Sequence, residues 1–123
     1  QWRGQVELAL SRVELRALQP RVLAGTARVM DLRQSSPPLE FGSYELAFAE
    51  GAADNTDIVG VLRDLQGPVG VAGSLRLRTT GEYEVDGTVV ARPTAGAELQ
   101  RLIEFLGPVD AQGARPFSLA GTL

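Results

Sequence analysis

The sequence contains no cysteine, no histidine and no lysine, and each absence excludes a class of chemistry. Without cysteine there are no disulfides, thiolate metal sites or cysteine nucleophiles. Without histidine, the commonest general base and the commonest transition-metal ligand are both missing. Without lysine, Schiff-base chemistry and the lysine of phosphate-binding loops are excluded. Carboxylate pairs are the main catalytic option that is left.

The chain also lacks a basic stripe and a long apolar run. Its net charge is −3 and its twelve basic residues, all arginine, are spread along the sequence, which argues against nucleic-acid binding. No apolar run approaches the ~20 residues that span a bilayer. The sequence opens at Gln1 without an initiator methionine or a signal-peptide pattern. We expect residues 1–123 to be a single β-rich domain and a fragment of a longer chain.

The stretch from Gly67 to Pro93 predicts one β-hairpin with a defined register. Its apolar residues alternate with small or charged ones at the two-residue period of a strand. A three-residue turn over Thr79, Thr80 and Gly81, with Gly81 in the left-handed conformation, closes this hairpin. The register then sets four cross-strand pairs on the two arms: Leu77 with Tyr83, Arg76 with Glu84, Leu75 with Val85, and Gly73 with Gly87.

This register gives the hairpin one apolar face and one charged face. Arg78 lies opposite Glu82 and Arg76 opposite Glu84, and such pairs contribute a few tenths of a kcal/mol to about 1 kcal/mol each. A slip of one residue would reverse every side chain on one strand, so the register is well specified.

The rest of the chain predicts further strands and a helix. Trp2 to Leu18 alternates and then shifts phase, which predicts a strand with a bulge near Ser11 and Arg12; a helix is the alternative. Further strands are expected at 21–32, where Gly25 marks a bulge or a close backbone approach, and at 41–50, 58–62 and 117–123. The segments 34–40, 51–57 and 64–68 are expected to be breakers, loops and turns.

Near the C-terminus the period becomes helical. Leu99, Leu102, Ile103 and Leu106 form one stripe, with Phe105 at its flank. Thr94 is the expected N-cap, and Gly107 with Pro108 ends the helix. The fold class we predict is therefore mainly β: a curved antiparallel meander sheet, open or a half-barrel, of about seven strands, with this one amphipathic helix packed on its apolar face.

Several clusters of residues are candidate sites, but we assign none of them a catalytic, cofactor-binding or metal-binding role. Asp54 to Asp57 has oxygen ligands on a loop but lacks the glycine and bidentate glutamate of a calcium loop. The acidic stripe of Glu82, Glu84 and Asp86 is expected to be a surface ladder neutralised by arginines. Gly67 to Gly70 and Gly113 precede no helix, so they do not form a phosphate cradle. Trp2 is expected to be a core or rim anchor, with a partner-facing position as the alternative.

The order of several glycine-containing segments resembles a known family. These segments are Pro38 to Leu46, Leu65 to Leu75, Gly81 to Tyr83 leading to Gly87, and Leu106 to Gly113 with Ser118 to Leu123. They are similar to the C-terminal half of type II secretion system protein N, a subunit of the general secretion pathway. The resemblance covers most of residues 38–123, and residues 2–32 less closely.

The resemblance implies a non-enzymatic subunit of the machinery that exports folded proteins across the outer membrane. It implies an inner-membrane anchor upstream of this fragment, which would lie on the periplasmic side. The implied partners are other secretion subunits, either the periplasmic domains of the secretin or inner-membrane platform proteins. No cofactor and no catalytic residue is carried over from the family.

Three functional hypotheses follow. The first is an interaction module that uses a sheet edge or face, including a homodimer formed by edge-strand pairing. The second is a lipid-binding or lipid-transfer groove of an envelope protein, which requires that Leu102, Ile103 and Leu106 do not fill the apolar face. The third, an enzyme built on two carboxylates, has the least support in the sequence.

Overall fold

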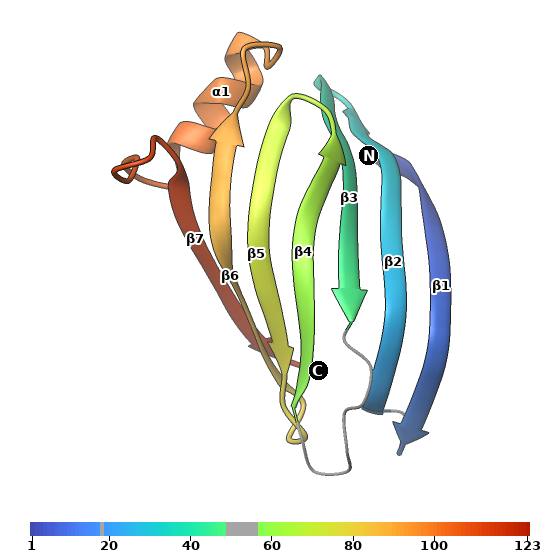
Figure 1. The fold of residues 1–123 in the computed structure, drawn as a ribbon. Helices are drawn as coiled ribbons and strands as arrows, with labels where there is room; N and C mark the ends of the chain where they lie inside the picture. The colour runs from blue at the N-terminus through green and yellow to red at the C-terminus, as the bar shows by residue number, and fades with distance from the viewer. Residues whose placement is uncertain (18, 49–56) are drawn as a thin grey trace.

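The computed structural model describes residues 1–17, 19–48 and 57–123. These residues form seven strands and, near the C-terminus, one helix (Figure 1). In chain order the elements are β1 (Trp2–Arg16), β2 (Gln19–Ser35), β3 (Pro38–Phe48), β4 (Ile58–Gln66), β5 (Val69–Leu77), β6 (Glu82–Ala91), α1 (Ala97–Glu104) and β7 (Arg115–Thr122).

Every strand pairs with the strand that follows it in the chain, and every pairing is antiparallel. The spatial order is therefore β1 to β7 without a crossover, which is a meander. Figure 1 shows a curved sheet in which β1 and β7 lie at opposite margins. The sheet is open, because β1 and β7 are not hydrogen-bonded neighbours. The predicted fold class is confirmed.

The β5–β6 hairpin has the predicted register. Leu77 pairs with Tyr83, Leu75 with Val85, Arg76 with Glu84 and Gly73 with Gly87. The turn closes between Arg78 and Glu82, whose backbone N–H and C=O are 2.8 Å apart, and Gly81 has the positive φ of 91° that the prediction required. We call the side that carries Leu75 and Val85 the inner face, and the opposite side the outer face.

The register extends both faces across the whole sheet. On the inner face, Val85 is continued by Leu119 of β7, and Leu75 by Gly60 of β4 and then Phe48 of β3. Leu46 continues the same face through Ala27 of β2 to Leu8 of β1. Because side chains alternate along each strand, this pairing places most apolar residues of the seven strands on one side.

The predicted bulge in the first strand is confirmed, and the helix alternative is wrong. The ladder between β1 and β2 shifts between Leu10 and Arg12, which leaves Ser11 as the extra residue of β1. Gly25 lies opposite this bulge with a φ of 115°, and a Cβ placed on it would be 2.2 Å from the carbonyl oxygen of Ala9. Only glycine allows the two backbones to come this close.

Two connections between strands are shorter in the structure than predicted. β4 continues to Gln66, so only Gly67 and Pro68 form the turn that was expected at 64–68. β2 continues to Ser35 and β3 begins at Pro38, so the expected breaker over 34–40 is a turn of Ser36 and Pro37. Ladder hydrogen bonds to neighbouring strands extend these elements into polar residues that have weak intrinsic strand preference.

The helix packs on the inner face at one end of the sheet, where β5 begins and β6 ends. Leu99 and Ile103 are buried there with Val69, Val89 and Ala95. Leu102 and Leu106, which were predicted to share the buried stripe, are exposed at 46% and 48%. The helix also begins after Gly96, so the predicted N-cap at Thr94 is wrong. The helix therefore covers one end of the inner face. At the other end Ile58 and Leu77 are also buried, so the uncovered part of this face is its middle and its two margins.

Candidate interaction surfaces

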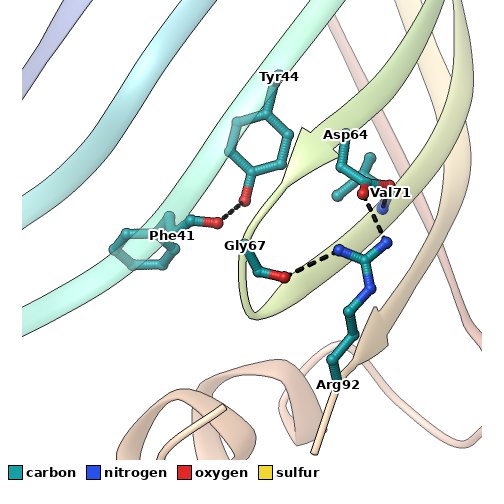
Figure 2. A network of polar contacts seen from close by, with 6 residues as sticks. All are labelled: Phe41, Tyr44, Asp64, Gly67, Val71 and Arg92. Carbon is teal, nitrogen blue, oxygen red and sulfur yellow. Dashed lines mark hydrogen bonds and ion pairs between the residues drawn. The ribbon is translucent and has the colours of Figure 1, made fainter. Parts of the chain in front are cut away.

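A partly buried polar cluster connects the helix end of the sheet to the turn between β4 and β5 (Figure 2). The Arg92 guanidinium, just after β6, donates to the carboxylate of Asp64 on β4 at 2.6 Å and to the carbonyl of Gly67 at 2.9 Å. The other Asp64 oxygen accepts the backbone N–H of Val71 at 2.9 Å. Burial acts to raise the pKa of Asp64, but these hydrogen bonds outweigh it and lower the pKa overall.

Tyr44 on β3 lies beside this cluster and donates its hydroxyl proton to the carbonyl of Phe41. Burial raises the pKa of Tyr44 to about 12, and the negative charge of Asp64 makes a smaller contribution in the same direction. The phenol is thus neutral at physiological pH and serves as a hydrogen-bond donor. The cluster satisfies buried polar groups and holds the helix connection in place.

The outer face carries several ion pairs between neighbouring strands. Glu45 on β3 is 4% exposed and lies between Arg28 of β2, at 2.8 Å, and Arg63 of β4, at 2.9 Å. Hydrogen bonds from these two arginines lower the pKa of Glu45. This site was not among those predicted from the sequence, although its signal is present there: arginine and glutamate occupy outer-face positions of adjacent strands.

The ion pairs of the β5–β6 hairpin differ from the predicted ones. Arg78 bonds Glu84 diagonally at 3.2 Å, and Arg76 reaches Asp57 at 3.6 Å, although the backbone register is as predicted. Long arginine side chains reach diagonal neighbours as easily as direct ones. Asp86, the last member of the acidic stripe, accepts a hydrogen bond from Ser118 at 2.7 Å. The stripe is a surface ladder, as expected.

The candidate cation loop lies mostly outside the described residues, which include only Asp57 of its four members. Within the described parts of the chain, no group of three or more acidic side chains is arranged to hold a metal ion. Trp2 packs its ring against Phe41 with 5.2 Å between centroids, while 59% of Trp2 stays exposed. It is a rim residue, as the sequence analysis expected.

Part of the inner face carries apolar side chains that the fold leaves exposed or only partly buried. Three of its apolar side chains near the sheet margins, Val6, Leu8 and Leu119, are more than half exposed. Between them, the inner-face residues of the central strands are only partly buried: Leu46, Leu62, Leu75 and Val85. A contiguous group of exposed apolar side chains on a folded protein often marks a site that binds another molecule.

The helix adds a smaller apolar patch on its exposed side. Phe105 is 86% exposed, and Leu102, Leu106 and Val109 beside it are also exposed. At the margins of the sheet lie two backbone edges, the long β1 and the shorter β7, which no other strand of residues 1–17, 19–48 and 57–123 covers. The structure thus presents one apolar face, one apolar patch and two open edges.

Surfaces of this kind occur in several classes of protein, and a comparison with protein families shows to which one the chain belongs. A family model described as type II secretion system (T2SS), protein N matches residues 1–118. The chain belongs to this family. As a protein N of type II secretion, it is a component of the system that the sequence resemblance indicated, and that prediction is confirmed.

No curated protein and no solved structure matches this chain. Among the described residues, no helix has the length and apolar character needed to cross a membrane.

Proposed function

We propose that this chain is a non-enzymatic interaction module that supports assembly of the type II secretion machinery. It acts as one domain, residues 1–123, on the periplasmic side of the inner membrane, to which the full-length protein is anchored. Its uncovered inner face binds a periplasmic domain of another secretion subunit, in the secretin or in the inner-membrane platform.

The observation that carries this proposal is the position of the helix. A helix that sealed the sheet would bury Leu102 and Leu106 against it, whereas Leu99 and Ile103 alone are buried. The inner face therefore keeps exposed apolar side chains that a protein partner would cover. Membership in the protein N family supplies the class of partner.

A pair of matched substitutions tests the proposal. Leu119 on the inner face is 58% exposed and Val61 on the outer face is 56% exposed, so both tolerate a charge to a similar degree. The wild-type chain is immobilised and offered purified periplasmic domains of the secretin and platform subunits. We expect it to retain one of them, the Leu119→Glu variant to lose it, and the Val61→Glu variant to keep it. Retention of none, or equal loss in both variants, would overturn the proposal.

A second candidate function is lipid binding or transfer, and the same uncovered face favours it. The lipid hypothesis required that Leu102, Ile103 and Leu106 do not fill the apolar face. Ile103 is buried at one end of this face, which counts against the hypothesis there, whereas Leu102 and Leu106 are exposed and do not fill it. An acyl chain on this face would be shielded from water by the side chains of the central strands.

Native mass spectrometry of the purified chain separates the two functions. A lipid groove predicts co-purified lipid that is lost in Leu119→Glu and kept in Val61→Glu. A lipid-free wild-type protein that binds a secretion subunit would exclude the second function and support the first.

A further inference from the structure

The first nine residues of β1 form a regular backbone edge, and no strand among the described residues pairs with its free side. The Gln1 carbonyl accepts the N–H of Ser35 on β2 at 2.9 Å, so the backbone groups of Gln1 point toward β2. In an antiparallel ladder successive residues point to alternate sides. The even-numbered residues from Trp2 to Leu10 therefore direct their N–H and C=O groups away from the sheet.

This part of β1 is undistorted. The ladder shifts between Arg3 and Gln5, but the extra residue there belongs to β2, in the segment 30–33. The bulge of β1 itself comes later, at Ser11. A ribbon from Trp2 to Leu10 without a bulge of its own is consequently available for strand addition.

The outer-face side chains of this ribbon include one positive and one negative charge at equal distances from a central residue. Arg3 and Glu7 carry opposite charges and lie on the same side of β1, with Gln5 halfway between them. Within the described residues, neither Arg3 nor Glu7 has an ion-pair partner. On the other side of the ribbon, Trp2 and Leu8 are exposed apolar residues.

We propose that two copies of this chain pair antiparallel through β1, with a two-fold axis at Gln5. Arg3 of each copy then lies opposite Glu7 of the other. These pairs fall at the non-hydrogen-bonded positions, where opposed Cα atoms are only about 4.5 Å apart. Trp2 lies opposite Leu8 and Gly4 opposite Val6 at the hydrogen-bonded positions, which joins the inner faces of the two copies into one apolar surface.

Other pairings fit the charges less well. An axis at Glu7 would place two glutamates opposite each other, and an axis at Val6 would leave Arg3 opposite Ala9. The β7 edge has eight residues, contains Pro116 and has no acidic side chain, so it offers neither a long ladder nor a charge match. β1 is the edge whose sequence complements itself.

The dimer requires no secretion subunit, so it is tested separately from the partner binding proposed above. The association of the 123-residue chain is followed by sedimentation at concentrations up to ~1 mM, because a single strand edge is a small interface. We expect a reversible dimer. Arg3→Glu and Glu7→Arg should each weaken it at least ~10-fold, since like charges then face each other twice.

An equimolar mixture of the two variants is the decisive sample. The Arg3→Glu chain has two acidic residues at these positions and the Glu7→Arg chain has two basic ones, so every cross-strand pair in the mixture is again opposite in charge. The mixture should dimerise as tightly as wild type. A monomer at every concentration, or a dimer that ignores both substitutions, would overturn the proposal.

A disulfide test gives the register directly, because the wild-type chain contains no cysteine. Gln5→Cys places two thiols across the axis at a separation that a disulfide spans, and mild oxidation should yield a covalent dimer. Ala9→Cys, also on the outer face, is the control: its two copies would be about 27 Å apart along the ribbon. Cross-linking of Ala9→Cys in preference to Gln5→Cys would show a different register and contradict the axis.

Discussion

Leu99 is the main anchor of the helix, and its truncation should destabilise the whole sheet. Its side chain is 3% exposed and packs with Val69, Val89 and Ile103. Leu→Ala substitutions at such sites cost about 2–5 kcal/mol, from the lost apolar burial and the cavity left behind. The helix has only eight residues and two buried side chains, so little else can hold it. We expect a loss near 3 kcal/mol.

The expected loss translates into a measurable shift in melting temperature. A chain of 123 residues has an unfolding entropy of about 0.26 kcal/mol/K, so 3 kcal/mol lowers Tm by about 12 °C. Calorimetry or circular dichroism measures this shift directly. Leu102→Ala is the matched control, because Leu102 lies on the same helix and is 46% exposed; its Tm should fall by less than half as much. Equal shifts in the two variants would refute the packing described here.

Three other predictions follow from the sheet. Gly73→Ala would place a Cβ 2.5 Å from the carbonyl oxygen of Asp86 and should cost about 1–3 kcal/mol in thermal unfolding, whereas Gly96→Ala, which meets no atom within 4 Å, should cost far less. The lowered pKa of Glu45 means that its contribution to stability is present above its ordinary pKa and is lost as pH falls through the folded value, so Glu45→Gln should flatten the acid side of a Tm–pH profile. The raised pKa of Tyr44 should appear in an ultraviolet titration of the Tyr83→Phe protein as a phenolate midpoint near 12; a midpoint near 10 would contradict its burial.

The register of the hairpin was predictable because two constraints agreed. Alternation set the faces, and Gly81 supplied the left-handed residue that a three-residue turn needs. The bulge at Ser11 was predictable for a similar reason, because an inserted residue shifts the phase of the apolar pattern. These are local signals, and local signals survive folding when the tertiary structure supports them.

The helix shows where local signals are insufficient. A helical stripe of four apolar residues predicts a buried face, but the length of the connection from Arg92 and its anchoring to Asp64 decide where the helix lies. In the structure it reaches only the end of the sheet, so Leu102 and Leu106 are exposed. The Asp64–Arg92 pair joins residues 28 positions apart, and no periodic pattern in the sequence reveals such a contact.

The same limit applies to the candidate surfaces. The sequence indicated an apolar sheet face and unpaired edges, but not how much of the face the helix leaves uncovered. It placed Arg76 opposite Glu84, whereas the side chain of Arg76 reaches Asp57. Backbone register follows from pattern, while the partner of a long side chain depends on the three-dimensional neighbours.

Thiol labelling tests most directly whether the inner face is uncovered. Because the wild-type chain contains no cysteine, the introduced thiol is the only one that can react. Single substitutions Leu119→Cys on the uncovered inner face, Val61→Cys on the outer face and Leu99→Cys under the helix are each exposed to a maleimide in the folded, lipid-free protein. We expect the Leu119 and Val61 positions to react at similar rates and the Leu99 position to react far more slowly. A thiol at position 119 that reacts as slowly as the one at 99 would contradict an open inner face.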